Sequence, residues 1–393
     1  MDDTTRPGRT GLWLNGARGS VATTTIVGLA ALRAGLAPPT GCVTELPGIR
    51  SAALPDWADL VVGGHDVSAV SPHKSAEHLV ASGVLPAGVT GAVAPQITAA
   101  EAELRRGYDP AVDRDGQGAA ARRMAADIDD FARRHDLRRV VVVNVASTEA
   151  PVPDLPEHHD AAALEAALDD PARGVLPASA VAAYAAVLAG SPYVEFTPSM
   201  GINCPALREL AERRGLPYAG SDGKTGQTLL RTALAPMFTE RGFAVRSWAG
   251  TNLLGGGDGA TLADPETAAS KLASKARGLA ALVGEQATAP LHIDHVPDLE
   301  QTKVAWDHVR AEGFLGTPVT LQLTWTGYDS ALAAPLVLDL VRLVAMAHRA
   351  GQRGALPALA CFFKDPIGSD EHRFDHQVRR LYDWVRATAG GAG

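Results

Sequence analysis

The strongest strand signal in this chain lies at residues 139–146, which read Arg-Val-Val-Val-Val-Asn-Val-Ala. An unbroken apolar run of this kind is typical of a parallel strand that is buried on both faces. Shorter runs of similar character occur at residues 11–15 and 60–66, and helix-like segments lie between the three. Strands that alternate with helices indicate an α/β fold built on a parallel sheet.

Polar residues follow two of the predicted strands at the point where each one ends. Residues 147–151 follow the strongest run, and a second strand-like segment at 193–199 ends with Ser199. Ligands of open α/β sheets bind at the carboxyl ends of the strands. Both segments are therefore candidates for the ligand-binding edge of the sheet.

A glycine turn joins the first predicted strand to an apolar helix over residues 23–34. Gly16 and Gly19 would let the backbone approach a pyrophosphate, whose charge the helix N-terminus would face. The dinucleotide-binding motif is incomplete because Leu14 stands at its first glycine, so a plain strand–helix turn is the alternative. A second strand is predicted at 41–46, where Glu45 would bind an adenosine ribose hydroxyl.

Two further glycine-rich loops open predicted helices. Residues 221–228 precede a helix at 229–241 and have the composition of a phosphate-binding loop, although the P-loop pattern is absent. Residues 255–260 precede a helix that Asp264 would cap. On that helix Lys271 and Lys275 lie four residues apart and share one face; an ordinary solvated basic face is the alternative to a site.

Lysine is rare in this chain. Of the 36 basic residues thirty are arginine, and five of the six lysines lie between residues 224 and 364: Lys224, Lys271, Lys275, Lys303 and Lys364. Arginine stays protonated, whereas lysine is a compact charge that can lose its proton. A chain that otherwise uses arginine would keep lysine where proton transfer matters. These five lysines are therefore candidates for a polyanion and proton-transfer site.

The remaining segments are predicted with less consequence for function. A strand at 292–297 would place His292 and His295 on opposite faces, so the pair is a poor metal site, and no metal ligands are predicted. A helix is predicted at 306–310 and a strand at 319–325. A long apolar helix at 331–350, capped by Asp329 and Ser330, is expected to pack on the sheet.

Composition excludes several classes of protein. The chain has 393 residues, which suffices for two domains, and its net charge of −8 gives no support for nucleic-acid binding. No apolar run is long enough to span a membrane, since Asp339 and Arg342 interrupt the nearest one. The N-terminus is polar and unlike a signal peptide, and three widely spaced cysteines fit a reduced, cytoplasmic setting.

Taken in order, the motifs resemble those of the myo-inositol-1-phosphate synthase family (inositol-3-phosphate synthases), more closely the archaeal form. The resemblance covers nearly the whole chain. The motifs that carry it are Leu14-Asn15-Gly16-Ala17-Arg18-Gly19-Ser20-Val21, Gly63-Gly64-His65, Asn144-Val145-Ala146-Ser147-Thr148-Glu149, Phe196-Thr197-Pro198-Ser199, Asp222-Gly223-Lys224-Thr225-Gly226-Gln227-Thr228, Asp258-Gly259, Ser270-Lys271, Ser274-Lys275, Lys303, Asp329-Ser330, Ala333-Ala334-Pro335-Leu336 and Phe363-Lys364.

The resemblance implies a Rossmann-type NAD-binding domain from residues 1–240 and 328–393, with an inserted α+β catalytic and tetramerisation domain at 241–327. It implies a homotetramer that binds NAD and a sugar phosphate, and leaves an added divalent or monovalent cation open. The implied catalytic residues are Asp222, Lys271, Lys275, Lys303 and Lys364. Those implied for the cofactor are Gly16, Ala17, Arg18, Gly19, Ser20, Val21, Glu45, Ala146, Ser147, Thr148, Asp222, Asp329 and Ser330. Those implied for the substrate are Ser199, Lys224, Thr225, Gln227, Asn252, Leu253 and Asp258.

The reaction implied by the family is the redox-neutral cyclisation of glucose 6-phosphate to myo-inositol 1-phosphate. Lys271 and Lys303 would stabilise or protonate carbonyl-derived oxygens, Lys275 and Lys364 would hold the phosphate or move protons, and Asp222 would orient a lysine or the nicotinamide end. The chain departs from the family at Ala260, where archaeal relatives have lysine, and at Glu195, where asparagine is usual.

Those two departures leave one alternative within the family open, and three alternatives come from other classes of protein. A specialised homologue would close a five-membered cyclitol phosphate from fructose 6-phosphate. A net NAD-dependent sugar-phosphate dehydrogenase would not need clustered lysines, and a Schiff-base aldolase would use one lysine without NAD. A non-catalytic sugar-phosphate sensor is a further alternative.

Overall fold

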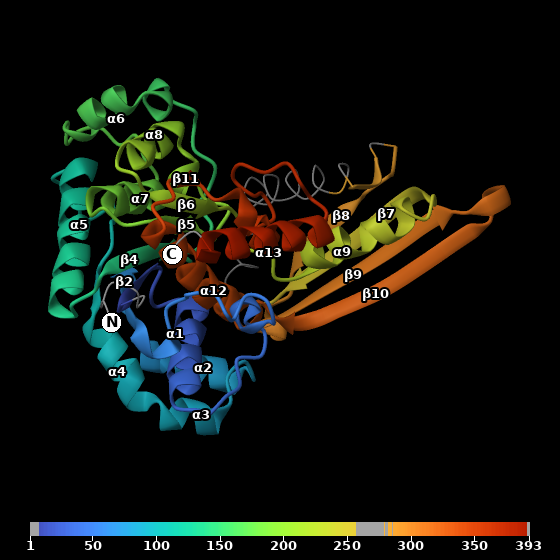
Figure 1. Cartoon of the computed structure of the whole chain (residues 1–393), viewed down its shortest axis with the longest axis horizontal. Helices are drawn as coiled ribbons and strands as arrows, with labels where there is room; N and C mark the ends of the chain where they lie inside the picture. Colours follow the sequence, from blue (N-terminus) through green and yellow to red (C-terminus); the bar gives the residue numbers. More distant parts are fainter. Residues whose placement is uncertain (1–7, 257–278, 280–281, 285, 391–393) are drawn as a thin grey trace.

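The computed structural model describes residues 8–256, 279, 282–284 and 286–390. The chain forms two sheets, which lie side by side along the long axis of the molecule (Figure 1). The predictions at Asp258, Ala260, Asp264, Lys271 and Lys275 fall outside the described residues.

The first sheet is parallel and has seven strands in the order β11-β6-β5-β4-β1-β2-β3. Read from β3 to β6, this is the strand order of a dinucleotide-binding Rossmann sheet. The bounds are β1 Thr10–Asn15, β2 Leu60–Asp66, β3 Leu104–Arg106, β4 Arg139–Asn144, β5 Tyr193–Glu195, β6 Pro217–Gly220 and β11 Gly354–Ala355.

The two faces of this sheet have separate hydrophobic cores, which explains the unbroken apolar runs. Val141 and Val143 of β4 pack with α1 and α12, whereas Val140 and Val142 pack with α5 and α7. Successive side chains of β4 point to opposite faces of the sheet, and both faces are buried, so the side chains on each face need to be apolar. The helices are α1 Ser20–Arg33, α2 Pro72–Ala81, α3 Ala87–Ala92, α4 Ala94–Ala102, α5 Gln117–Arg134, α6 Ala161–Leu168, α7 Ala178–Leu188, α8 Pro205–Arg213, α12 Asp329–Arg349 and α13 Phe374–Gly390.

Helix α12 confirms the predicted long core helix. Among the described helices it alone is long and apolar enough to cross a membrane, but most of it is buried inside the molecule. Its two interior charges are satisfied: Asp339 accepts hydrogen bonds from Val43 N and from Thr44, and Arg342 contacts Glu45. It is therefore a core helix.

The same contacts explain why the strand predicted at 41–46 is wrong. Val43–Glu45 forms a short 3-10 helix because its backbone N–H groups bond to the Asp339 carboxylate instead of to a sheet. The strand that pairs beside β1 is β2.

The second sheet is four-stranded, in the order β10-β9-β7-β8, with β7 and β8 parallel and the other pairs antiparallel. The helix predicted at 306–310 is wrong, since it lies inside strand β9, where buried and more exposed residues alternate with a period of two. Helix α9, Gln227–Thr239, packs on one face of the sheet. The strands are β7 Ala244–Leu254, β8 Leu291–His295, β9 Thr302–Glu312 and β10 Pro318–Tyr328.

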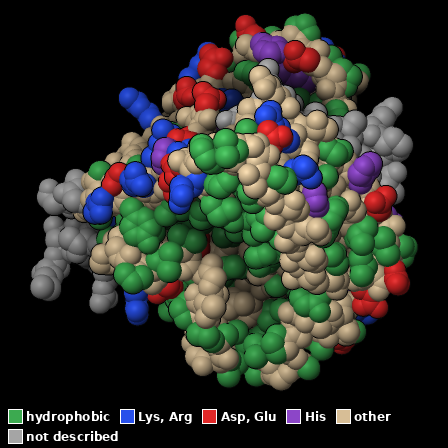
Figure 2. Space-filling view, turned by 90° about the vertical axis from the view of Figure 1, so that its right-hand side faces the viewer, with side chains coloured by type: hydrophobic (Ala, Val, Ile, Leu, Met, Phe, Trp, Pro, Cys, Tyr) green, Lys and Arg blue, Asp and Glu red, His purple; other side chains and the backbone are tan. Residues whose placement is uncertain are grey.

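Strands β9 and β10 form a long hairpin that extends away from the parallel sheet (Figure 1). Figure 2 looks onto the end of the molecule that this hairpin forms. Hydrophobic side chains cover much of the centre and lower half of that face, while Lys and Arg gather at its upper left. Phe314 and Leu315, in the turn of the hairpin, are each 87% exposed.

Candidate active site

A row of residues in register marks the carboxyl edge of the parallel sheet. His65, Asn15, Asn144, Glu195 and Gly220 are neighbours on strands β2, β1, β4, β5 and β6. The loop that follows each of these residues lines one or more of three neighbouring cavities. The predicted ligand-binding edge of the sheet is thus where the cavities lie.

The loop after β1 has the geometry of a pyrophosphate site. Gly16 has φ of +86°, and a Cβ there would come 2.5 Å from Ala146 Cα, so only glycine fits. The N–H groups of Gly16 and Ala17 donate to His65 O. Helix α1 has no side-chain cap, so the N–H groups of its first turn are left for a ligand.

The cavity beside this turn has a volume of about 630 Å³. The Ser330 hydroxyl on its wall is buried and has no hydrogen-bond partner among the described residues. An anion-binding helix start and a free hydroxyl both suit a dinucleotide, so the residues fit NAD. The predicted cofactor residues on this wall are Gly16, Arg18, Gly19, Ser20, Val21, Ala146, Ser147, Asp329 and Ser330.

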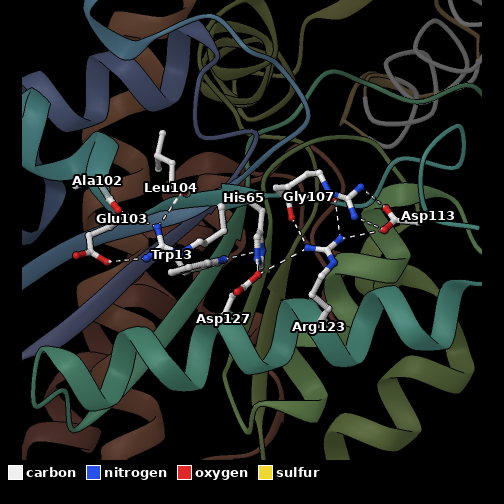
Figure 3. Close-up of polar contacts among 11 residues, drawn as sticks. Trp13, His65, Ala102, Glu103, Leu104, Gly107, Asp113, Arg123 and Asp127 are labelled. Carbon is white, nitrogen blue, oxygen red and sulfur yellow. Dashed lines mark hydrogen bonds and ion pairs between the residues drawn. The ribbon is translucent and has the colours of Figure 1, made fainter. Parts of the chain in front are cut away.

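The side chain of His65 does not line this cavity; it lies between Trp13 of β1 and Asp127 of α5 (Figure 3). Trp13 Nε1 donates to His65 Nδ1 at 2.9 Å, so the other ring nitrogen, Nε2, carries the hydrogen that faces Asp127 Oδ2 at 3.2 Å. Burial lowers the pKa of His65, with Asp127 acting in the opposite direction. This neutral histidine ties β2 to β1 and to α5, while its carbonyl holds Gly16.

Glu45 does not lie at the end of a strand, which is where the residue that binds the ribose was predicted. Its carboxylate contacts Arg342 at 2.7 Å and Arg50 at 3.3 Å, and it does not follow a strand. The acidic residue at the end of the strand after α1 is Asp66, which lines the NAD cavity and accepts a hydrogen bond from Arg18 N. The sequence signal for Asp66 was its place at the end of the run 60–66.

Two predicted catalytic lysines meet carboxylates at the cleft: Lys364 lines a smaller cavity of about 100 Å³, Lys303 lines the NAD cavity, and Asp329 lines both. Lys364 Nζ donates to Asp222 Oδ1 at 2.7 Å, and both side chains are nearly buried. Lys303 Nζ donates to Asp329 Oδ2 at 3.0 Å, and Thr225 donates to Asp329 Oδ1 at 2.6 Å. Two of these contacts, Lys364–Asp222 and Thr225–Asp329, join residues that are 142 and 104 positions apart in the sequence.

The electrostatics of Asp329 reflect these two lysines. Burial raises the pKa of its carboxyl, but the charges of Lys303 and Lys364 and the hydrogen bonds from Thr225 and Lys303 outweigh burial. The net pKa lies well below the usual range, so Asp329 is an anion beside the Lys303 and Lys364 side chains. Thr148 also lines this small cavity.

Lys224 lines neither of the cavities that Lys303 and Lys364 line. Its Nζ donates to Gln377 Oε1 at 2.6 Å and lies 5.8 Å above the Phe374 ring, both in α13. Burial lowers the pKa of Lys224 to about 8. The described contacts of Lys224 are therefore with the C-terminal helix, and its predicted contact with substrate stays a prediction.

Gln227 and Asn252 belong to a buried network centred on Asp307, which sequence reasoning missed. Gln227 Nε2 donates to Asp307 Oδ2, and Asn252 Nδ2 donates to Gln227 Oε1, both at 2.8 Å. Arg231 and Trp248 also donate to Asp307. Asn252 Oδ1 is buried and has no partner among the described residues.

The other predicted substrate residues lie in different places. Ser199 lines a third cavity of about 500 Å³ together with Asp222 and Asp365, and its hydroxyl accepts a hydrogen bond from Glu149 N. Leu253 pairs with Val304, whereas its neighbour Leu254 lines the NAD cavity. Among the described residues, no group of three or more His, Cys, Asp and Glu is placed to hold a metal ion.

The strand order, the glycine turn and the cavity define a Rossmann-type NAD-binding protein. Residues 10–386 match the family described as Myo-inositol-1-phosphate synthase. The chain is also 33% identical, over 97% of its length, to inositol-3-phosphate synthase 1 of Bacteroides thetaiotaomicron, of which it covers 95%. It therefore belongs to the myo-inositol-1-phosphate synthase family and is an NAD-dependent enzyme of the isomerase class.

More distant comparisons agree on the fold. Inositol-3-phosphate synthase from Caenorhabditis elegans superposes with a TM-score of 0.85 at 23% identity, covering 98% of this chain and 86% of that chain. A myo-inositol-1-phosphate synthase-related protein from Thermotoga maritima gives a TM-score of 0.76, also at 23% identity, covering 96% and 98%. The Trypanosoma brucei brucei synthase is 33% identical over 58% of this chain and 44% of its own length.

Proposed function

We propose that the protein converts glucose 6-phosphate to myo-inositol 1-phosphate without net oxidation or reduction. The observation that carries this proposal is the pair of lysines beside the NAD cavity, Lys303 and Lys364, each held by a carboxylate. A simple dehydrogenase needs one proton-transfer group, whereas ring closure builds negative charge on oxygen more than once.

In this reaction a sugar hydroxyl is oxidised, the neighbouring carbon loses a proton, and the resulting enolate attacks the aldehyde to close the ring. Bound NAD would accept the hydride at the start and return it at the end. Lys303 would stabilise and protonate the oxygen of the enolate and of the ring alkoxide. Preorganised donors of this kind are each worth about 3–4 kcal/mol when buried.

Lys364 would hold the substrate phosphate or move protons, with Asp222 fixing the direction of its ammonium group. Lys271 would act with Lys303 and Lys275 with Lys364, as the family resemblance implies. If Lys271→Arg, which keeps the charge, retained full turnover, the proton-transfer role of Lys271 would be wrong.

We assign NAD binding to the predicted set Gly16, Ala17, Arg18, Gly19, Ser20, Val21, Ala146, Ser147, Thr148, Asp222, Asp329 and Ser330, with Asp66 replacing Glu45 at the ribose. The Oδ1 of Asn252, which has no hydrogen-bond partner among the described residues, supports its role as a substrate ligand, beside Ser199, Thr225, Gln227 and Asp258. The NAD-binding domain would comprise residues 1–240 and 328–393, and the catalytic and oligomerisation domain residues 241–327.

The test is incubation of the purified protein and NAD with glucose 6-phosphate or fructose 6-phosphate, with the product identified by NMR. Myo-inositol 1-phosphate formed without accumulation of NADH supports the proposal. A five-membered cyclitol phosphate from fructose 6-phosphate, or steady NADH release, would replace it with one of the alternatives. A substrate adduct trapped by borohydride without NAD would indicate an aldolase instead.

We also propose that the enzyme is a cytoplasmic homotetramer. Helix α9 covers one face of the four-stranded sheet, and the opposite face carries Trp306, His308, Thr251 and Thr324, with Trp306 39% exposed. Such a face is suited to contact with a second copy of the chain. Light scattering tests the mass, and cell fractionation tests the location; the three cysteines are free and buried, which suits a reducing compartment.

A further inference from the structure

Glu195 is a fully buried carboxyl group at the end of β5, directly beneath the cavity wall formed by Phe196, Thr197 and Pro198. Its Oε1 accepts hydrogen bonds from Asn144 Nδ2 at 2.7 Å and from Thr197, through N at 3.1 Å and Oγ1 at 2.6 Å. All of these donors are neutral. Glu195 is thus held in the interior by uncharged donors and does not itself line the cavity.

The second oxygen, Oε2, shows where a proton would lie. It is 3.2 Å from Tyr193 Oη, which is also 3.2 Å from Ser179 O. A carbonyl can only accept, and a tyrosine hydroxyl has one hydrogen to donate. When that hydrogen goes to Ser179 O, the contact between Glu195 Oε2 and Tyr193 Oη is a hydrogen bond only if Oε2 carries a proton and donates it.

The surroundings favour this neutral form. Burial raises the pKa of Glu195 to about 8, the hydrogen bonds from Thr197 and Asn144 oppose the rise, and the negative charge of Glu149 adds to it. Burial likewise raises the pKa of Tyr193, so its hydroxyl keeps its hydrogen. From the other packed elements, Gly220 of β6 and Gly201 bring no charged side chain against Glu195.

Glu195 in turn orients Asn144, the next residue in the row at the sheet edge. With its Nδ2 donating to Glu195 and Thr197, Asn144 presents Oδ1 to Asn15 Nδ2 at 2.8 Å and to Ala146 N at 3.4 Å. Ala146 and Thr197 both line the cavity that holds Lys364 and Asp222.

We propose that Glu195 is a neutral carboxylic acid in the folded protein and a positioning residue, which fixes Asn144 and Thr197 and so the loops after β4 and β5, where Ala146 lines the NAD cavity and Thr197 lines the smaller cavity beside it. The inference concerns protonation and NAD binding, so it does not depend on which sugar phosphate is the substrate.

The variants Glu195→Gln and Glu195→Ala test this directly. Gln reproduces the neutral acid, since its amide N–H donates where the O–H did and its carbonyl accepts as before. We expect E195Q to bind NAD within about twofold of the unmodified protein by calorimetry, and E195A to bind about tenfold more weakly because Asn144 and Thr197 lose the carboxyl oxygen to which both donate. Equal, strong losses in E195Q and E195A would overturn the proposal.

Infrared difference spectra supply a readout that a merely structural role would not move. Subtracting the E195Q spectrum at pH 6.5 should leave the carbonyl stretch of a protonated carboxyl group, and this band should vanish as the pH rises through about 8. The exposed Glu77→Gln variant is the matched control and should show no such band. A carboxylate signal alone at pH 6.5, in a protein with normal circular dichroism, would show that Glu195 is ionised and the proposal wrong.

Discussion

The two sheets of this protein use polar residues in opposite ways. In the parallel sheet the interiors of β1 and β4 are apolar, and polar side chains such as Asn15 and Asn144 stand at the ends of strands. In the four-stranded sheet a charged residue, Asp307, lies in the middle of β9 and is 1% exposed. The first sheet stacks its polar groups beneath a ligand cleft, whereas the second encloses them between sheet and helix.

The difference follows from what covers each sheet. Apolar side chains of the helices pack on both faces of the parallel sheet, so a charge in the interior of β1 or β4 would have no partner. The four-stranded sheet packs on α9, which supplies Arg231 and Gln227 to Asp307. A buried pair of this kind holds α9 in one position on the strands, and those strands deliver Lys303 and Leu254 to the cleft. Polar residues at the carboxyl edge of the parallel sheet thus lie beside the cleft, whereas those at the centre of the four-stranded sheet hold a helix in place.

The largest expected effect is a loss of turnover when a lysine at the carboxyl edge of the parallel sheet is changed. Lys364→Met removes the ammonium group held by Asp222 and should lower turnover about 10²–10³-fold, the usual loss for one preorganised donor. The exposed Lys74→Met is the control and should keep full activity. Steady-state rates with glucose 6-phosphate measure both, and normal turnover of K364M would remove this lysine from the mechanism.

The centre of the second sheet should respond in stability. Asp307→Leu leaves the Arg231 guanidinium buried without a counter-charge, which costs about 3–5 kcal/mol of unfolding free energy. Urea unfolding measures the loss, and the exposed Asp298→Leu should change little. The double variant Arg231→Leu with Asp307→Leu should recover much of the loss; if it is no more stable than Asp307→Leu alone, the ion pair is not what couples α9 to the sheet.

A smaller effect is expected from pH at the edge of the parallel sheet. Glu195 has a folded pKa of about 8 against an ordinary value of 4.5, so the folded protein holds this proton over a range where the unfolded chain releases it. The unfolding free energy should therefore fall as pH rises between these values, by at most about 1.4 kcal/mol per pH unit from this group.

The E195Q variant checks this slope. It should match the unmodified protein near pH 4.5 and be the more stable of the two above pH 8 in urea titrations at each pH. Parallel curves for the two proteins would show that Glu195 is already ionised in the folded state.

The smallest effect on folding is expected at the face of the four-stranded sheet opposite α9. Trp306→Ser should change the unfolding free energy of the protomer by about 0.5 kcal/mol or less, since the side chain is partly exposed. If this face joins protomers, light scattering should nevertheless show that the variant dissociates at a higher protein concentration than the unmodified protein does. The exposed Arg310→Ser on the same strand is a comparison with less apolar area; unchanged association of W306S would place the interface elsewhere.

Local patterns in the sequence determined the parallel sheet, the glycine turn and the candidate lysines. Apolar runs such as 139–146 and the φ freedom of Gly16 are properties of neighbouring residues, so they can be recognised without coordinates. Lys303 and Lys364 could be selected in the same way, because the scarcity of lysine is a property of composition.

Tertiary structure decided which groups meet. Trp306 lies in a strand because β7 and β10 pair on either side of β9. The carboxylate of Glu45 contacts Arg342 and Arg50 and does not line the NAD cavity. The pairs Lys364–Asp222 and Lys303–Asp329 join separate segments, and the proton on Glu195 depends on what buries it. Contacts between distant residues and the removal of water set these features, and neither is encoded in local periodicity.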